Sequence, residues 1–241
     1  TLLLHDALPI CYATSDLPDR DFVFGGTIVS NGDVGYHGRS EKDRLNMTGT
    51  THGSIECING QWYVFYHRLT HKSDYSRQAC AEPITILPDG SIPQVEITSC
   101  GLNGKPLHGT GTYPAVIACN ITNGHMPHGS NKIYTDSFPN ATHCGEDRII
   151  GEIQDGTMLG FKYFAFSGAK EIGVQYRGSC NGKFVVSDDM DGKNIVAEIP
   201  VAPADAWTES RAPLHISDGT HPLYLFYRGD GEAAVKELYL A

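Results

Sequence analysis

Three carboxylates stand where acid–base chemistry could take place. Glu56 and Glu82 lie beside aromatic-rich segments of the chain, and Asp33 lies in a glycine-flanked loop. A carboxylic acid and a carboxylate held near one bond can act as general acid and general base. Each residue also has a simpler role: hairpin hydrogen bonding for Glu56, a strand-end ion pair with an arginine for Glu82, and an Asx-type turn for Asp33. We expect the simpler roles.

Histidine and cysteine are the other candidates for chemistry, as metal ligands. Among the 11 histidines, His67 and His71 have a spacing that would share one face of a helix, but they lie in an expected strand and loop. A zinc hydrolase is therefore disfavoured, and His67 is assigned no role. The cysteines are odd in number and form no Cys-x-x-Cys pair, which favours free thiols in a reducing compartment. These are Cys11, Cys57, Cys80, Cys100, Cys119, Cys144 and Cys180.

The segment from residue 50 to residue 68 contains the secondary structure expected to position polar side chains for chemistry. It predicts a strand over residues 55–58, a two-residue turn at Asn59-Gly60, and a second strand over residues 62–67. Asn-Gly favours a type I′ turn, because both central residues need positive φ. The polar residues His52-Gly53-Ser54 directly precede the first strand. The segment therefore predicts a hairpin that carries a site.

Composition narrows the class of protein. The 241 residues include 27 Gly and 13 Pro, are 40% hydrophobic, and show little helical periodicity. Such a chain is long enough for one large or two smaller packed domains, and we expect it to be all-β. The net charge of −10 disfavours nucleic acid and anionic membranes as partners, since both bind clustered Lys and Arg. A neutral partner such as a sugar fits better.

The order of three motifs is more specific than any one of them. His52-Gly53-Ser54-Ile55 comes first, then Asn59-Gly60 with the aromatic strand after it, and then Ser76-Arg77 followed by Glu82-Pro83-Ile84. Over about residues 11–107 this order resembles the C-terminal blades of a glycoside hydrolase family 43 enzyme. The resemblance implies part of a five-bladed β-propeller, and an activity that cleaves α-L-arabinofuranosyl or β-D-xylosyl linkages in plant polysaccharide with inversion.

The resemblance also assigns the site. The catalytic carboxylates of the family are expected upstream of residue 11, so no catalytic residue is assigned in this chain. His52 matches the histidine at the propeller axis, which helps to hold a central calcium or sodium ion or its waters. Arg77 matches the arginine that lines the sugar pocket, where a guanidinium can bind sugar hydroxyls.

The first ten residues do not match what precedes this unit in the family. They also lack the charged flank and the small-residue cleavage site of a secretory signal. We expect residues 1–10 to be foreign or mis-joined sequence, with a divergent strand as the alternative, and the chain to begin mid-protein. A segment with only the last blades of a propeller should expose strand edges and apolar faces, and should be unstable or sticky by itself.

A glycine-rich stretch, residues 101–111, predicts a linker, and a second domain is expected over residues 108–241. Short strands predict a β-sandwich there. They are expected over residues 160–166, 171–176, 183–186, 195–199, 212–216 and 222–227.

This second domain resembles a carbohydrate-binding module of family 6. The resemblance rests on the strand at residues 195–203, on Trp207, on residues 218–227 and on residues 236–240. It implies that a sugar stacks between two aromatic rings, with Trp207 as one and Phe161 or Tyr163 as the other. The chain departs from the family where Met158 and Lys236 replace an exposed ring and a terminal Asn. The alternative is that Trp207 fills the sandwich and the domain braces the propeller.

Three functions therefore remain open. The chain is an inactive fragment of a glycosidase, a carbohydrate-binding protein that acts through the sandwich, or a structural remnant with neither activity. The expected partners are arabinose- or xylose-containing oligosaccharides or polysaccharides, with no nucleic acid and no membrane. The free cysteines favour the cytoplasm and the binding module favours export, so the compartment is left unassigned.

Overall fold

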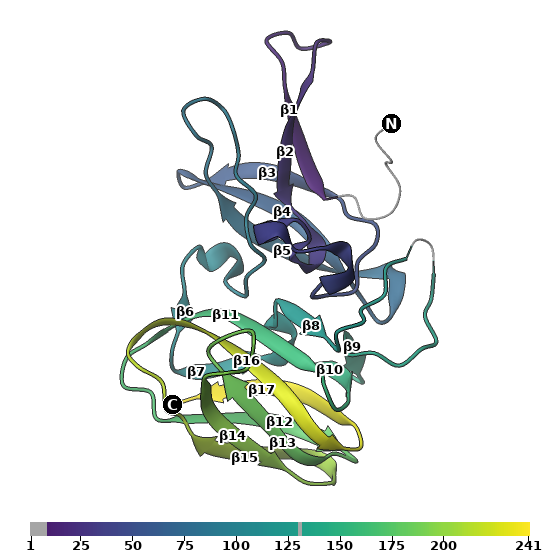
Figure 1. The fold of residues 1–241 in the computed structure, drawn as a ribbon, viewed down its shortest axis with the longest axis vertical. Coiled ribbons are helices and arrows are strands. Elements are labelled where there is room, and N and C mark those ends of the chain that lie inside the picture. Colours follow the sequence, from purple (N-terminus) through teal and green to yellow (C-terminus); the bar gives the residue numbers. More distant parts are fainter. Residues whose placement is uncertain (1–8, 130–131) are drawn as a thin grey trace. The chain divides into compact units, whose positions relative to one another are not determined.

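A computed structural model describes residues 9–129 and 132–241, which form two compact units (Figure 1). Unit 1 comprises Thr1–Ile97 and Pro127–Tyr134, and unit 2 comprises Thr98–Met126 and Thr135–Ala241. The predicted foreign origin of residues 1–10 falls mostly outside the described residues and stays a prediction. Within the described ranges, no helix is long and apolar enough to cross a membrane.

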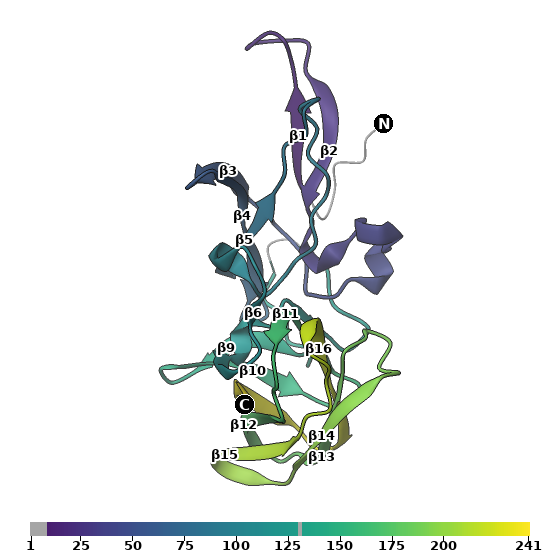
Figure 2. The same cartoon turned by 90° about the vertical axis from the view of Figure 1, so that its left-hand side faces the viewer.

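Unit 1 contains two antiparallel sheets. β1 (Ile10–Thr14) pairs with β2 (Val23–Val29), and β3 (Gly53–Ile58), β4 (Gln61–Thr70) and β5 (Ser73–Ile84) form a three-stranded sheet in that order. Figure 2 shows the β1–β2 hairpin as a long, narrow extension of this unit. Three short 3-10 turns lie between β2 and β3: η1 (Asn31–Asp33), η2 (Tyr36–Gly38) and η3 (Glu41–Asp43).

The predicted hairpin is confirmed as β3 and β4. Asn59 and Gly60 have φ values of 51° and 84°, as a type I′ turn requires. The turn sets the register, so that Ile58 pairs with Gln61 and Gly53 pairs with Tyr66. The same register, continued one residue past Gly53 and Tyr66, places His52 opposite His67.

Unit 2 is a sandwich of two sheets. The first sheet runs β15 (Ala204–Pro213), β12 (Glu171–Gly178), β17 (Ala233–Leu240), β10 (Asp147–Ile153) and β9 (Asn140–Cys144), with β7 (Gly111–Pro114) paired to β17. The second runs β14 (Ile195–Val201), β13 (Asn181–Ser187), β16 (Gly219–Asp230), β11 (Met158–Phe166) and β6 (Leu107–His108), with β8 (Asn120–Thr122) paired to β11. Two 3-10 turns, η4 (Gly101–Asn103) and η5 (Ala115–Ile117), complete the unit.

The core of unit 2 explains why it holds together. Phe161, Phe164, Phe184 and Tyr227 are all 0% exposed and belong to one continuous hydrophobic cluster. Burying an aromatic side chain of this size contributes about 1.5–3 kcal/mol. Alternating strand residues from both sheets supply this cluster, as expected for a sandwich.

Most of the predicted strands of unit 2 are present within longer ones. The predicted strand at residues 212–216 is wrong, because β15 ends at Pro213 and residues 214–217 are irregular. The backbone N–H groups of Leu214 and His215 donate instead to Lys170 and Val196, outside any strand ladder. The predicted boundary at residue 107 lies inside unit 2, since β6 already pairs with β11.

The all-β prediction is confirmed, since the described residues contain strands and short 3-10 turns but no α-helix. The two units differ in how well their apolar surface is covered. Large hydrophobic side chains are exposed mainly in unit 1, at Leu17, Phe22, Val23, Phe24, Ile55, Ile58, Trp62, Tyr75, Ile86, Leu87 and Ile133. Unit 2 exposes only Leu102 and Ile195 among its described residues. The open sheets of unit 1 match the expectation of separate blades with uncovered faces.

Candidate functional site

A hollow of about 400 Å³ lies on the β3–β4–β5 sheet of unit 1. It is lined by His52, Gly53, Ser54, Phe65, Tyr66, His67, Arg77 and Ala79. Both residues that the motifs assign to this unit, His52 and Arg77, therefore line one hollow. His67 lines the hollow as well, although the motifs assign it no role.

Two of the lining residues, His52 and His67, are in contact with each other. The rings of His52 and His67 stack with centroids 5.6 Å apart and planes inclined by 30°. His67 lies on β4, on the same face as Phe65, because strand side chains alternate. Counting back from the Asn59-Gly60 turn would have paired His67 with His52, so the signal that identifies it was present in the sequence.

Thr50 connects the hollow's polar side chains. His67 donates from Nε2 to the Thr50 carbonyl oxygen at 2.6 Å. Arg77 donates from Nη2 to the Thr50 hydroxyl at 3.1 Å. Behind them, the buried Asn31 donates from Nδ2 to the His67 carbonyl oxygen and to the Thr51 hydroxyl, each at 3.0 Å. The bond to the Thr50 carbonyl requires a proton on His67 Nε2, so Nδ1 of the neutral ring is left as an acceptor.

The surroundings of His67 favour its neutral form. Desolvation by burial is the largest cause that lowers the pKa of His67, and the charges of Arg77 and His52 lower it further. The hydrogen bond to Thr50 opposes them. The hollow therefore presents one charged donor, Arg77, beside an imidazole that resists protonation.

The three candidate carboxylates are engaged elsewhere, and none of them lines the hollow. Glu56 is exposed on β3 and accepts a hydrogen bond from the N–H of its neighbour Cys57. Glu82 is buried and accepts one from the Tyr66 hydroxyl at 3.2 Å. The buried Asp33 accepts a hydrogen bond through Oδ1 from the N–H of Ile97 at 2.7 Å.

A central calcium or sodium ion does not fit the residues of this hollow by themselves. Such ions take several oxygen ligands, often carboxylates. The lining side chains offer two imidazoles, the hydroxyls of Ser54 and Tyr66 and the positive charge of Arg77, but no carboxylate. Within residues 9–129 and 132–241, no group of three or more His, Cys, Asp or Glu side chains could hold a metal ion. The ion expected near His52 stays a prediction.

The predicted sugar-stacking residues of unit 2 lie in different environments. Trp207, on β15, is half-buried and lies outside the hydrophobic cluster, so it does not fill the sandwich. Phe161, on β11, is 0% exposed, so the expectation that it stacks on a sugar is wrong: its ring has no free face. Tyr163 is half-buried on the same strand, in the other sheet from Trp207.

Trp207 belongs to a polar cluster on the first sheet. Its indole Nε1 donates to Asp147 Oδ2 at 3.0 Å, and Lys236 pairs with Asp147 Oδ1 at 2.8 Å. The guanidinium of Arg177 and the ammonium of Lys236 lie 4.8 and 5.8 Å from the ring centroid. Trp207 and Lys236 both lie at β-bulges, where the register between paired strands shifts. A bulge changes the direction in which a side chain points. We call Trp207, Arg177, Lys236 and Asp147 the Trp207 cluster.

Comparison with known proteins gives one close relative. No family model matches the chain. The chain is 42% identical over 254 aligned residues to a xylosidase/arabinosidase of Thermoclostridium stercorarium. This chain is a homologue of that protein. The match covers 100% of this chain and 52% of the relative, so the chain spans about half the relative's length.

Solved structures give weaker likenesses. A family 43 arabinoxylan arabinofuranohydrolase from Bacillus subtilis, crystallised with cellotetraose, is 19% identical with a TM-score of 0.48, over 97% of this chain and 47% of its own. A family 6 carbohydrate-binding module from Clostridium cellulolyticum, crystallised with xylose, is 14% identical with a TM-score of 0.47, over 56% of this chain and 98% of its own. The homologue from Thermoclostridium stercorarium is named for the two activities, xylosidase and arabinosidase, that the motif resemblance implies.

Proposed function

We propose that this chain is part of a glycoside hydrolase that removes arabinofuranosyl or xylosyl groups from plant polysaccharide with inversion. In this proposal unit 1 recognises the sugar and does not supply the acid and base. The observation that carries it is the convergence of His52 and Arg77 on one hollow, in a chain homologous along its length to a xylosidase/arabinosidase.

The hollow offers what a neutral sugar needs. Arg77 supplies charged N–H donors, His67 Nδ1 supplies an acceptor, and Phe65 supplies an apolar wall for C–H groups. Its volume of about 400 Å³ falls among small-molecule sites, which span about 300–1,000 Å³. The partners that fit are arabinose- or xylose-containing oligosaccharides.

The acid and base must come from outside the hollow's own residues. An inverting glycosidase needs two carboxyl groups about 6.5–9.5 Å apart, to leave room for the attacking water. Since Glu56, Glu82 and Asp33 are engaged elsewhere, we infer that the chain by itself does not cleave glycosides.

Two measurements on the chain test the proposal. An NMR titration with L-arabinose, D-xylose and arabinoxylo-oligosaccharides should shift the signals of Thr50, His52 and His67. The shifts should disappear in Arg77→Ala and persist in the matched control Arg20→Ala, an exposed arginine of the same unit. Shifts that are absent, or unchanged in Arg77→Ala, would refute recognition by the hollow.

The second measurement is hydrolysis of 4-nitrophenyl α-L-arabinofuranoside and β-D-xyloside. We expect no release of 4-nitrophenol above that of the buffer. Release that is abolished by Glu82→Gln or Glu56→Gln would show that the chain carries its own catalytic carboxylates, and would overturn their structural assignment.

The Trp207 cluster supports a second candidate, carbohydrate binding by the sandwich alone. Gln175 lies two positions before Arg177 on β12. Its buried Oε1 has no hydrogen-bond partner among the described residues, which would suit a ligand hydroxyl. Affinity electrophoresis in xylan or arabinan gels tests this candidate. Retardation that is lost in Trp207→Ala, but kept in Trp62→Ala, would favour it. Failure of both this test and the titration would leave a structural remnant.

A further inference from the structure

A serine, a histidine and an aspartate meet at one end of unit 2, away from the Trp207 cluster. Ser217 Oγ lies 3.2 Å from Nε2 of His221. On the other side of the same ring, Nδ1 lies 3.7 Å from Oδ2 of Asp188. The two ring nitrogens thus face a hydroxyl and a carboxylate, the arrangement by which an imidazole activates a serine.

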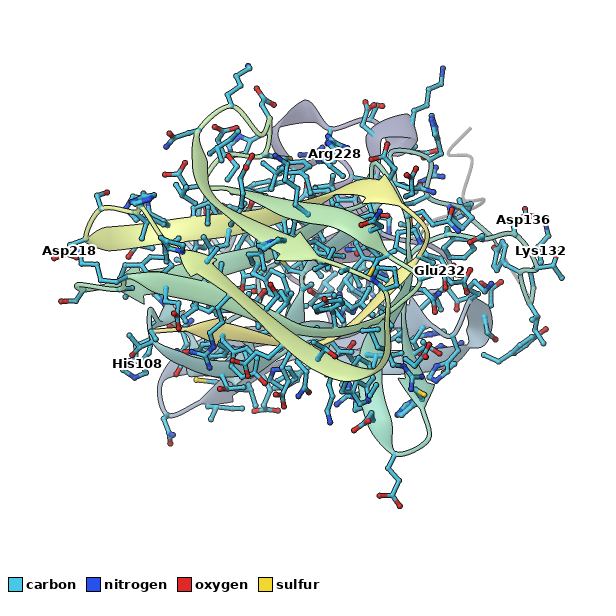
Figure 3. The ribbon with its side chains drawn as sticks, turned by 90° about the horizontal axis from the view of Figure 1, so that it is seen from below. His108, Lys132, Asp136, Asp218, Arg228 and Glu232 are labelled. Carbon is cyan, nitrogen blue, oxygen red and sulfur yellow. The ribbon has the colours of Figure 1, made fainter. Side chains whose placement is uncertain are left out.

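The sandwich fold brings these residues together. β13 and β16 pair so that Ser187 lies opposite Tyr224, which places Asp188, the next residue, beside the start of β16 and His221. Ser217 comes from the loop that leads into β16. Figure 3 shows the neighbouring Asp218 at the tip of this loop, at the opposite end of the sandwich from Glu232.

Neighbouring residues hold the arrangement in place. Asn194 donates from Nδ2 to the other carboxylate oxygen of Asp188 at 2.7 Å, which leaves Oδ2 directed at His221. The ring of Phe166 lies 6.3 Å from that of His221. Asp218 accepts a hydrogen bond from the N–H of Gly168 at 2.7 Å, which anchors the loop.

The solvent exposure of the three side chains decreases from Ser217 to His221 to Asp188, as expected for an accessible nucleophile with a shielded carboxylate. Ser217 is exposed, while the side chains of His221 and Asp188 are 24% and 17% exposed. Substrate can therefore reach the hydroxyl while the carboxylate stays largely shielded. Among the residues that the structure describes, no acceptor takes the backbone N–H of Ser217 or Asp218. N–H groups at and after a nucleophile are the donors that commonly stabilise an oxyanion.

We propose that Ser217, His221 and Asp188 form a hydrolytic site for esters of small carboxylic acids. The Ser217 oxygen adds to the ester carbonyl carbon while His221 Nε2 accepts the hydroxyl proton. The bond to the alcohol oxygen then breaks, and the alcohol leaves with that proton, so that an acyl–Ser217 ester remains. Water adds to the carbonyl carbon of this ester and gives a proton to Nε2. The bond to the Ser217 oxygen then breaks, Nε2 returns the proton to that oxygen, and the carboxylic acid leaves.

The open position of Ser217 sets the substrate class. An exposed hydroxyl on a loop can reach an acyl group that projects from a large molecule, while it offers little surface to grip a long acyl chain. Asp188 positions the imidazole and does not touch the substrate. The proposal does not depend on the glycosidase assignment, because it uses none of the hollow's residues.

The test uses the whole chain with a fluorophosphonate probe and with 4-nitrophenyl acetate. Mass spectrometry should find the phosphonyl adduct on Ser217 and lose it in Ser217→Ala. Turnover should fall about tenfold or more in Ser217→Ala and in His221→Gln. It should fall in Asp188→Asn as well, while labelling of Ser217 slows.

Two control variants separate this chemistry from adventitious reaction. Ser210→Ala removes a serine hydroxyl that donates to the Pro200 carbonyl, and His215→Gln removes an exposed histidine. Both should keep full turnover, and circular dichroism should show every variant folded. Absence of an adduct on Ser217, or equal turnover in Ser217→Ala and the unmodified chain, would overturn the proposal.

Discussion

His52 and His67 stack across the open end of the β3–β4 hairpin, with ring centroids 5.6 Å apart. One ring comes from the residue before β3 and the other from the middle of β4. The charges of Arg77 and His52 both lower the pKa of His67 and so oppose its protonation. Neutral His67 can therefore accept a hydrogen bond beside the Arg77 donors, which suits a neutral, hydroxyl-rich ligand.

The first prediction concerns the protonation of His67. Its pKa should lie below the ordinary 6.5, with burial as the main cause, and should rise toward 6.5 in Arg77→Gln because a positive charge is removed. An NMR titration of the histidine ring protons from pH 4 to pH 8 measures both. A pKa for His67 above that of an exposed histidine would contradict the assignment.

The same shift makes stability depend on pH. A base whose pKa is lowered by folding stabilises the fold fully above its unfolded pKa of 6.5, and that contribution is lost as the pH falls through the folded pKa. Unit 1 should therefore lose stability below about pH 6.5. His67→Gln should flatten this part of the curve in urea unfolding at several pH values, while His37→Gln, on an exposed turn, should not.

The second prediction compares two glycines of the same hairpin. A Cβ added to Gly53 would lie 2.2 Å from the Phe65 carbonyl oxygen, so Gly53→Ala should disturb the ladder and cost about 1–3 kcal/mol. Gly60 has open space around it but a φ of 84°, so Gly60→Ala should cost about 1 kcal/mol through backbone strain.

Binding separates the two glycine variants further. Gly53→Ala should abolish sugar-dependent shifts at the hollow, whereas Gly60→Ala should preserve them because the turn is remote from the lining residues. Urea unfolding and the NMR titration measure the two effects. Equal loss of binding in both variants would mean that the hollow depends on the hairpin as a whole.

The third prediction concerns Trp207 as a reporter of Asp147. The hydrogen bond from Lys236 is the main cause that lowers the pKa of Asp147, and the bond from Trp207 adds to it. In a Trp62→Phe background, the emission of Trp207 should change only below the ordinary carboxyl pKa of 3.8, when Asp147 becomes protonated. Asp147→Asn should remove this transition. A transition at or above pH 3.8 would show that the cluster does not form.

The fourth prediction concerns the unequal covering of the two units. Because unit 1 exposes most of the large hydrophobic side chains, its amides should exchange with solvent faster than those of the unit 2 core. Hydrogen exchange of the whole chain should protect β11 and β16 most and β1 and β3 least. Uniform protection across both units would mean that they unfold as one cooperative body.

The sequence by itself determined the all-β class, the Asn59-Gly60 turn and, through its register, the pairing of His52 with His67. Such features are local, because a two-residue turn sets which residues face each other along both strands. Arg77 could be assigned from its motif, but its contact with Thr50 joins residues 27 positions apart and needed the β4–β5 pairing.

Only the tertiary structure decided which faces are buried. Phe161 and Trp207 are both aromatic strand residues, yet Phe161 packs between the two sheets and Trp207 lies outside the core. Alternation gives the period of a strand, while the partner sheet decides which side of it becomes the interior. The meeting of Asp188 with His221 likewise follows from the pairing of β13 with β16, a contact between segments that no local pattern relates.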